Sequence, residues 1–545
     1  MTLVSDIRLA ELNSIISVIE KIRIANSDQK FVLIVDTQSL PILSSLVSTT
    51  DLVDKNVVLT ELYENKRQPL PYHAVYLLHP STDISILIND FSPKPNYTAA
   101  HVLFTYTCNQ SIIEALTQRP DVVKRILTMV DLYIHYIAIE PNFFVIQSPG
   151  AFISYHSSRS IIPWSSVCNE LVRGLVSFFF TLKTTPLIAY PKGSDVLPSL
   201  ARSFGDHMSS VIAENPSISF SNNNSLLIIV PRAADAVAPL LHQFSYQAMI
   251  RENMDIDNDT ITVKNPKSGD CVVPLNVYHS SLFANLRYSE FSEYSNSITS
   301  KFNEVRDYER RYQSIIDSET GEKKSFALKQ LAKAKKDHDE IINHYTLCTQ
   351  LSDMLSDRDL IKVSEFEQEM VIQSKNTTFE DLSTLILNPK PSPLDKARII
   401  ALYSLKTKNL NGEQLSRITS TARISDYSQA IRNLEFIRSS HLPRKNPINP
   451  SNPNPLKTDK FFPLVSEIVS DVYDDKLNSS VFEKPPHTGR YQNIVLFIVG
   501  GISYMELKSL NELKEKLKGT KLFIGSTNTL TPQQYLAQIG AISSQ

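Results

Sequence analysis

The chain has 545 residues, of which 42% are hydrophobic and 21% are charged, and its formal net charge is -2. This length predicts about three or four domains with large cores, and the composition is that of an ordinary soluble globular protein. A net charge this close to zero excludes a broad electrostatic field that would attract nucleic acid or anionic lipid, and leaves only local patches to consider.

The cysteines, at positions 108, 168, 271 and 348, are too scattered for a CxxC metal or redox motif and too few for a disulfide framework. A reducing cytosol fits this usage. The longest apolar stretch, residues 171–182, contains Arg173 and is too short to span a bilayer. The first residues follow an amphipathic pattern that is unlike a signal peptide. We therefore expect the protein to reach membranes only through a partner.

The first 140 residues alternate short apolar runs with helical or loop-like stretches. The runs favour strands at residues 31–36, 57–60, 73–78 and 101–105. Strands separated by helices are typical of a parallel sheet, so residues 1–140 are predicted to form an α/β domain.

Residues 141–250 repeat the α/β pattern, with a buried helix predicted at 171–182 and a strand, buried on both faces, at 225–230. Pro231 should end the hydrogen-bond ladder of that strand, and Asp235 can cap the segment after it. A helix is then predicted from apolar residues at roughly helical spacing: Leu240, Leu241, Phe244 and Met249.

Residues 251–480 are predicted to be chiefly helical. Apolar side chains recur at intervals of three and four from Tyr288 to Ile315 and again from Leu331 to Cys348. We predict an antiparallel hairpin of two long helices at about residues 288–357. No proline interrupts it, so we expect an extended hairpin without a bend. Its cation-rich shoulder either meets an acidic helix or faces solvent: Lys323, Lys324, Lys329, Lys333, Lys335 and Lys336.

The end of the chain returns to an α/β pattern. Residues 441–457 are predicted to be a mobile loop, because they are rich in proline and asparagine. Residues 493–500 and 521–525 favour two further apolar strands, which cannot bury both of their faces alone. They are predicted to join the sheet of strand 225–230. The second domain would then consist of residues 141–250 and 481–545, interrupted by a helical third domain at 251–480.

Catalytic motifs are missing from the sequence. There is no GxSxG elbow, HExxH pair, Walker loop or Cys-His spacing suitable for zinc, and the 13 glycines form no phosphate-binding loop. The Gly500–Gly501 pair is interpreted as a tight strand-to-helix turn. We expect no catalytic residue, cofactor or metal. The rival interpretation is a hydrolase or transferase with a degenerate α/β fold, whose acids and bases converge only in three dimensions.

Several segments carry a resemblance to a known family. They are HAVYLLHPSTDISILINDF at 73–91, YTAAHVLFT at 97–105, Pro239 to His242, Gln247 to Met249, and IGSTNTLTPQQYL at 524–536. They resemble the SM family, the Sec/Munc-type cytosolic proteins that clasp syntaxin-like SNAREs during vesicle fusion, and especially its plasma-membrane secretory branch. The chain departs from the family where Pro231 replaces the usual Asp before Arg232, which puts a polar network anchored on that carboxylate in doubt.

The resemblance implies an arch-shaped fold with two parallel-sheet α/β domains and a largely helical third domain that carries the long hairpin. In this family the first domain grips a closed syntaxin bundle. The matching positions are Asp36, Leu40, Glu61, Lys66 and Arg67. We expect these charged groups to be exposed at the ends of strands, as suits a polar-rimmed interface. The alternative is that Asp36 caps a turn and that the others are solvated surface.

Two further contacts are implied by the same resemblance. An apolar pocket for the N-terminal peptide of syntaxin would be lined by Ile113, Val123 and Ile126, unless these aliphatic residues are the core face of one helix. The hairpin would contact SNARE helices through four residues: Leu331, Tyr345, Leu347 and Leu351.

The implied function is that of a non-enzymatic regulator. It would hold a syntaxin-type SNARE and the assembled SNARE complex, and would promote SNARE assembly in vesicle docking and fusion during exocytosis. The alternative is a member of the same family that acts on an endosomal or vacuolar syntaxin. We expect a cytoplasmic monomer outside the complex, recruited peripherally to the plasma membrane or to vesicle membranes through syntaxin, with no nucleic-acid partner.

Overall fold

The computed structural model describes residues 6–25, 30–47, 49–157, 159–257, 259–265, 269–372, 377–406, 412–438, 442–444, 447–448, 460–486 and 489–542. The contacts divide the chain into two compact units. Unit 1 consists of Met1–Pro231, Asp471–Gly501 and Leu517–Asn528, and unit 2 consists of Arg232–Ser470, Ile502–Lys516 and Thr529–Gln545. The three-domain division of the sequence stays a prediction. Most of the predicted mobile loop, 441–457, lies outside the described residues.

Unit 1 contains a five-stranded parallel sheet in the order β2-β1-β3-β4-β5. Its strands are β1 (Phe31–Val35), β2 (Val57–Leu62), β3 (His73–Leu78), β4 (Ala99–Phe104) and β5 (Ile126–Asp131). The first four confirm the predicted strands. The edge strand β5 was not predicted, because Thr128 interrupts its apolar residues and none of its side chains is fully buried.

Alternate residues of β1 enter two separate hydrophobic clusters, so both faces of the sheet are buried. Leu33 packs with Ile19 of α1, whereas Ile34 packs with Leu87 of α4. This is the arrangement that a fully apolar strand in a parallel sheet predicts. The helices of this part are α1 (Ile7–Ala25), α2 (Leu40–Leu46), α3 (Thr49–Val53), α4 (Ser85–Phe91), α5 (Gln110–Thr117) and α6 (Pro120–Val123).

A second sheet of unit 1 has seven strands in the order β12-β8-β9-β13-β15-β7-β6. They are β6 (Ile137–Glu140), β7 (Phe143–Val145), β8 (Thr184–Pro191), β9 (Ser221–Pro231), β12 (Phe482–Glu483), β13 (Asn493–Val499) and β15 (Lys521–Ser526). The late strand β13 pairs in parallel with β9 on one side and with β15 on the other. The prediction that the tail strands complete the mid-chain sheet is therefore confirmed.

Aromatic side chains fill the core beside this second sheet. Phe144 of β7 stacks on Phe178 at a ring distance of 4.0 Å. A Cβ atom at Gly525 of β15 would lie only 2.4 Å from the Phe144 ring, so a glycine is required there. The helices of this part are α7 (Ala151–His156), α8 (Trp164–Leu182) and α9 (Leu197–Glu214). The helix predicted at 171–182 is the second half of α8.

The segment after β9 differs from its prediction. The strand ends at Pro231 as expected, but the chain then forms two 3-10 turns, η1 (Arg232–Ala234) and η2 (Ala238–Leu240), before α10 (Tyr246–Asn253). A helix through Leu240, Leu241 and Phe244 was therefore wrong. These three side chains are at most 3% exposed, so their spacing reflects burial on every side rather than one face of a helix.

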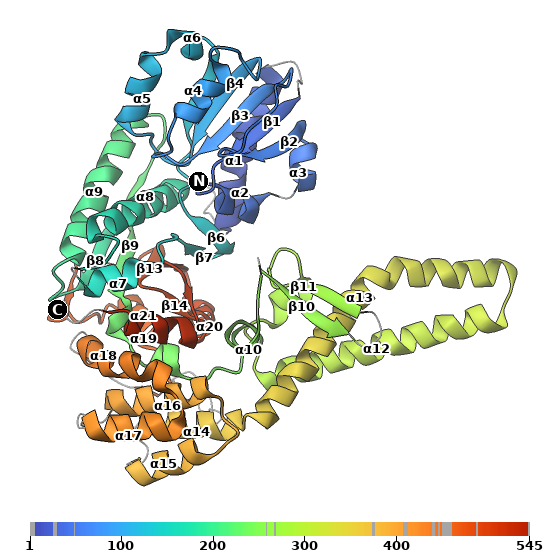
Figure 1. The fold of residues 1–545 in the computed structure, drawn as a ribbon, viewed down its shortest axis with the longest axis vertical. Coiled ribbons are helices and arrows are strands. Elements are labelled where there is room, and N and C mark those ends of the chain that lie inside the picture. Colours follow the sequence, from blue (N-terminus) through green and yellow to red (C-terminus); the bar gives the residue numbers. More distant parts are fainter. Residues whose placement is uncertain are drawn as a thin grey trace. The chain divides into compact units, whose positions relative to one another are not determined.

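Unit 2 contains the predicted hairpin, made of α12 (Phe291–Ser318) and α13 (Gly321–Asp357), which run side by side (Figure 1). Helix α13 continues through 37 residues without interruption, as the absence of proline predicted. An antiparallel pair that the sequence did not predict, β10 (Thr260–Asn265) and β11 (Gly269–Pro274), contacts α13 near the base of the hairpin.

The remaining elements of unit 2 are mostly short helices, which agrees with the prediction of a chiefly helical segment. They are α11 (Ser281–Leu286), α14 (Leu360–Val371), α15 (Phe379–Leu387), α16 (Pro393–Lys406), α17 (Gly412–Ala422), η3 (Ser425–Tyr427), α18 (Ser428–Arg438), β14 (Ile502–Ser503), α20 (Tyr504–Lys514), β16 (Thr529–Leu530) and α21 (Pro532–Gly540). Helix α19 (Leu464–Tyr473) begins in unit 2 and ends in unit 1.

Candidate partner-binding site

Asp36 follows β1 at the carboxyl end of the first sheet, and it is buried. Its carboxylate accepts hydrogen bonds from the backbone N–H of Ser39 at 2.7 Å, from the N–H of His79 at 2.6 Å and from the hydroxyl of Thr82. These bonds tie the start of α2 to the loop after β3. The expectation that Asp36 is exposed was wrong, because the loop N–H groups converge on it. The alternative of a turn-capping carboxylate describes it better.

Arg67, in the loop after β2, is also internal, with a side chain only 1% exposed. Its guanidinium group binds Asp90 at 2.6 Å and donates to the carbonyl oxygens of Tyr63 at 2.6 Å and Asn65 at 3.0 Å. Tyr76 donates a further bond to Asp90 at 2.9 Å. Arg67 was therefore wrongly expected at the surface. It holds the shape of the loop that presents its neighbour Lys66.

Asn65 and four other residues are exposed at this edge, and we refer to these four as the β1–β2 surface: Thr37, Gln38, Glu64 and Lys66. The backbone N–H of Thr37 donates to Glu64 at 3.1 Å, which joins the two loops. Lys66 is the one predicted residue among them. The other three were missed, although their positions directly after parallel strands are a signal for such an edge.

Two predicted residues are half-buried beside this surface. Leu40 begins α2, and Glu61 lies near the end of β2. One carboxylate oxygen of Glu61 is buried without a hydrogen-bond partner.

The residues predicted for the N-terminal peptide of syntaxin do not share one environment. Ile113 on α5 and Ile126 at the start of β5 are half-buried, whereas Val123 on α6 is 43% exposed. Two apolar residues that the prediction missed, Leu127 and Met129, are 56% and 37% exposed on the edge strand β5. The alternative in which one helix carries all three predicted residues was wrong, because they come from three elements.

The hairpin residues fall into two groups. Leu331 and Tyr345 are half-buried, and the ring of Tyr345 stacks on Phe302 of α12 at 3.9 Å. Leu347 and Leu351 have no exposed surface and belong to a core cluster with residues of β10 and β11. A contact of Leu347 or Leu351 with a partner helix is therefore excluded in this structure. The unpredicted β10–β11 pair covers them.

The segment from Pro239 to His242, which carries part of the family resemblance, takes part in an internal polar network. His242 contacts Glu367 at 2.9 Å and Asp395 at 3.0 Å, and Asp395 also binds Arg358. Burial and the nearby Arg398 lower the pKa of His242, but the two carboxylates outweigh them and the pKa lies above its ordinary value. Charged groups of this network therefore connect the loop after η2 with helices α14 and α16 of unit 2.

Arg232, which directly follows Pro231, has a buried carboxylate partner in this structure. Arg232 forms a bidentate pair with Glu506 at 2.5 and 2.7 Å, and both side chains are at most 1% exposed. Asp235 accepts from the backbone N–H of Val237 at 3.0 Å and of Leu464 at 3.0 Å. Asp235 thus ties the segment after β9 to the start of α19.

Within the described residues, one group has ligand atoms close enough to hold a metal ion: His79, His135 and Glu170. The Nε2 atom of His135 lies 2.8 Å and that of His79 3.5 Å from the same oxygen of Glu170. However, the backbone N–H of Ser81 donates to Nδ1 of His79, so neutral His79 carries its proton on Nε2, facing Glu170. We interpret the group as a hydrogen-bonded clasp between α8 and the loops after β3 and β5.

The electrostatics of this clasp agree with that interpretation. Burial would raise the pKa of Glu170, but hydrogen bonds from His135 and His79 and the charge of Arg173 hold it well below its ordinary value. Burial lowers the pKa of His135. A carboxylate that stays ionised between donors stabilises the arrangement without added ions.

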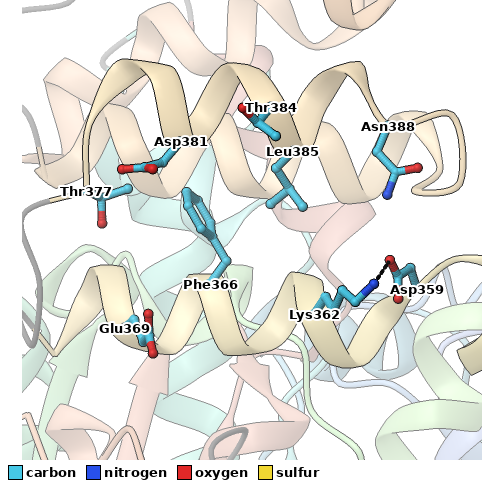
Figure 2. Close-up of a pocket in the computed structure, with 9 residues that line it drawn as sticks. All are labelled: Asp359, Lys362, Phe366, Glu369, Thr377, Asp381, Thr384, Leu385 and Asn388. Atoms are coloured by element: carbon cyan, nitrogen blue, oxygen red, sulfur yellow. Dashed lines mark hydrogen bonds and ion pairs between the residues drawn. The ribbon is translucent and has the colours of Figure 1, made fainter.

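Figure 2 shows a groove of about 490 Å³ between α14 and α15 in unit 2. Phe366 and Leu385 point into it from opposite sides, and Lys362 pairs with Asp359 at 3.3 Å at one end. A second cavity of unit 2, about 630 Å³, is lined mainly by polar groups such as Arg251 and Tyr504. A smaller cavity of about 140 Å³ adjoins the clasp. None of these three includes the residues predicted for the peptide pocket.

Among the helices in the described part of the chain, none is long and apolar enough to cross a membrane. Comparison of the sequence with protein families matches the model described as the Sec1 family over residues 31–538. Protein transport protein sec1 of Dictyostelium discoideum is 24% identical, with 94% of this chain and 95% of the relative covered. Human vacuolar protein sorting-associated protein 45 is also 24% identical, with 93% and 92% covered.

Solved structures show the same fold. The Unc18–syntaxin 1 complex from Monosiga brevicollis matches with a TM-score of 0.86 at 21% identity and covers 99% of this chain and 100% of that chain. The SM protein Vps45 in complex with the Qa SNARE Tlg2 matches with a TM-score of 0.85 at 21% identity and covers 98% of both chains. Together with the family match across most of the sequence, these findings show that the chain belongs to the Sec1 family.

Proposed function

We propose that the protein is a non-enzymatic SNARE regulator, which binds a syntaxin-type SNARE and the assembled SNARE complex and promotes SNARE assembly in vesicle docking and fusion. One observation carries this proposal. Two of the solved proteins that it matches over nearly its whole length were solved as complexes, one with syntaxin 1 and one with the Qa SNARE Tlg2. Binding of helices by an extended protein surface needs no chemistry beyond burial and complementary polar groups.

The β1–β2 surface is the region that we assign to the syntaxin bundle. It presents a cation at Lys66 and an anion at Glu64 beside the half-buried Leu40 and Glu61. Asp36 and Arg67 support the two loops from inside instead of touching the partner. The exposed apolar residues Val123, Leu127 and Met129 are the corresponding candidates for the N-terminal peptide.

We further propose that the protein acts in exocytosis, as a cytoplasmic protein recruited peripherally to the plasma membrane or to vesicle membranes through syntaxin. The similarity of several segments to the secretory branch supports this choice, as does the Dictyostelium sec1 relative. A second candidate is action on an endosomal or vacuolar syntaxin, which the human Vps45 relative and the fold match to Vps45 favour.

A binding titration tests both the function and the branch. The full chain is titrated with the cytosolic region of each syntaxin of the source organism, alone and within its assembled SNARE bundle. We expect one syntaxin to bind far more tightly than the others, and a plasma-membrane syntaxin identifies the secretory branch. Preference for an endosomal syntaxin would move the protein to the second branch. Failure of every syntaxin and every bundle to bind would contradict the proposal.

A further inference from the structure

The first half of α13 carries a concentration of positive charge that the proposed syntaxin surface does not use. Residues 321–339, the first half of the helix, contain six lysines and three acidic residues, in a chain whose formal net charge is -2. The two long helices contact each other along the hairpin, which leaves the outer side of α13 to solvent in this stretch. The charge therefore belongs to a local patch rather than to the whole molecule.

Most of this charge is not neutralised within the protein. Lys323 forms an ion pair with Glu319 at 3.1 Å. The other five lysines of the stretch are exposed, and within the described residues none of them forms an ion pair: Lys324, Lys329, Lys333, Lys335 and Lys336. A partner would meet charges that need not first be separated from internal counter-charges.

Helical geometry gathers part of this charge on one face. Lys329, Lys333 and Lys336 follow one another at the four- and three-residue spacing that places side chains on the same side of a helix. Ala327 is fully buried and marks the opposite side of the helix. Phe326 and Leu328 lie on the two sides of this face and are 55% and 50% exposed, although the Phe326 ring also lies 6.5 Å from the ring of Tyr312 on α12.

We propose that this lysine face, formed by Lys329, Lys333 and Lys336 with Phe326 and Leu328, binds the surface of membranes that contain anionic phospholipid. Unpaired lysines are attracted to the negative surface potential of such a membrane. Phe326 and Leu328 can enter the boundary between headgroups and acyl chains while the long lysine side chains keep their ammonium groups at the headgroups. We choose a lipid surface as the occupant because an anionic membrane offers a diffuse negative potential to the lysines and an apolar layer to the two exposed side chains.

Vesicle flotation with the full chain tests the proposal without any SNARE present, so its outcome does not depend on syntaxin binding. We expect the protein to float with vesicles of phosphatidylcholine and phosphatidylserine and not with phosphatidylcholine alone. Combining Lys329→Glu, Lys333→Glu and Lys336→Glu should weaken binding by about two orders of magnitude. Rising salt should weaken wild-type binding as well, because it screens the attraction. Circular dichroism and thermal unfolding of the variant should match wild type, since these three side chains are exposed and form no ion pair within the described residues.

A matched variant controls for total charge. Lys21→Glu, Lys94→Glu and Lys301→Glu change the net charge equally at three other exposed lysines, and should float as wild type does. Phe326→Ser with Leu328→Ser should weaken flotation about tenfold and leave its salt dependence in place. Equal flotation of wild type and the lysine-face variant overturns the proposal, as does an equal loss in the control variant. A lysine-face variant that floats normally but loses affinity for an acidic helical bundle would make this surface a protein contact instead.

Discussion

The carboxyl end of the first sheet and the outer half of the hairpin both show conspicuous charges in the sequence, and the structure uses them in opposite ways. Asp36 and Arg67 are buried, each with several hydrogen-bond partners. Lys329 and Lys333 are exposed and unpaired within the described residues. The difference arises from packing. A loop at a sheet end meets other loops on several sides, whereas a helix in a long two-helix hairpin meets only one neighbour along most of its length.

This comparison predicts that Arg67→Ala has the largest effect on stability. It leaves Asp90 buried without its cation and three backbone carbonyl oxygens without their donor. We expect unfolding free energy to fall by about 3–5 kcal/mol, as is usual when one partner of a buried pair is removed. Thermal and denaturant unfolding of the full chain measure it. The neighbouring Lys66→Ala serves as control and should change stability by less than about 0.5 kcal/mol. Equal losses of stability in both variants would contradict the distinction between the buried Arg67 and the exposed Lys66.

The hairpin offers the same contrast within one helix. Leu347 is fully buried in the cluster at the base, and Leu347→Ala should cost about 2–5 kcal/mol of unfolding free energy. Leu328, near the other end of α13, is half exposed, so Leu328→Ala should cost less than about 0.5 kcal/mol. Denaturant unfolding of the two variants compares them. A small loss at Leu347 would show that the β10–β11 pair does not close the base of the hairpin in solution.

Sequence patterns predicted most of the architecture for a physical reason. Apolar runs such as Leu226 to Val230 are long enough to identify buried strands, and the need to bury both faces of 493–500 placed that strand in the mid-chain sheet. The periodic seam from Tyr288 onward identified the hairpin. The candidate site was harder, because the exposure of a charge depends on partners distant in the chain. Asp90, which buries Arg67, lies 23 residues away, and nothing local indicates the pairing.

The pH dependence of folding stability tests whether the buried charged groups around His242 stabilise unit 2. The folded-state pKa of His242 lies above its ordinary value, so the stability contributed by its charged form is present below about pH 6.5 and is lost as pH rises through the raised folded-state pKa. The stability contributed by ionised Asp395 depends on pH in the opposite direction. Burial raises its pKa, but bonds from His242 and Arg358 hold it far below 3.8, so its contribution is lost only as pH falls into the acid range.

His242→Gln should therefore destabilise the protein by about 1–3 kcal/mol in mildly acidic buffer, and by less as the pH is raised. Denaturant unfolding of wild type and variant from mildly acidic to alkaline buffer records the difference. A difference that stays constant over that range would show that His242 is not charged in the folded state.

The most direct test concerns Lys66, the exposed cation of the β1–β2 surface, where we expect the smallest effect on stability. Lys66→Glu should leave thermal unfolding unchanged and weaken binding of the cognate syntaxin about tenfold, since it reverses one rim charge at the interface. Lys516→Glu, at an exposed lysine after α20, is the matched control and should bind as wild type does. Titration of the cognate syntaxin against wild type and the two variants measures the three affinities. Weaker binding of Lys66→Glu alone is the predicted result, and equal affinity of all three would contradict the assignment of this surface.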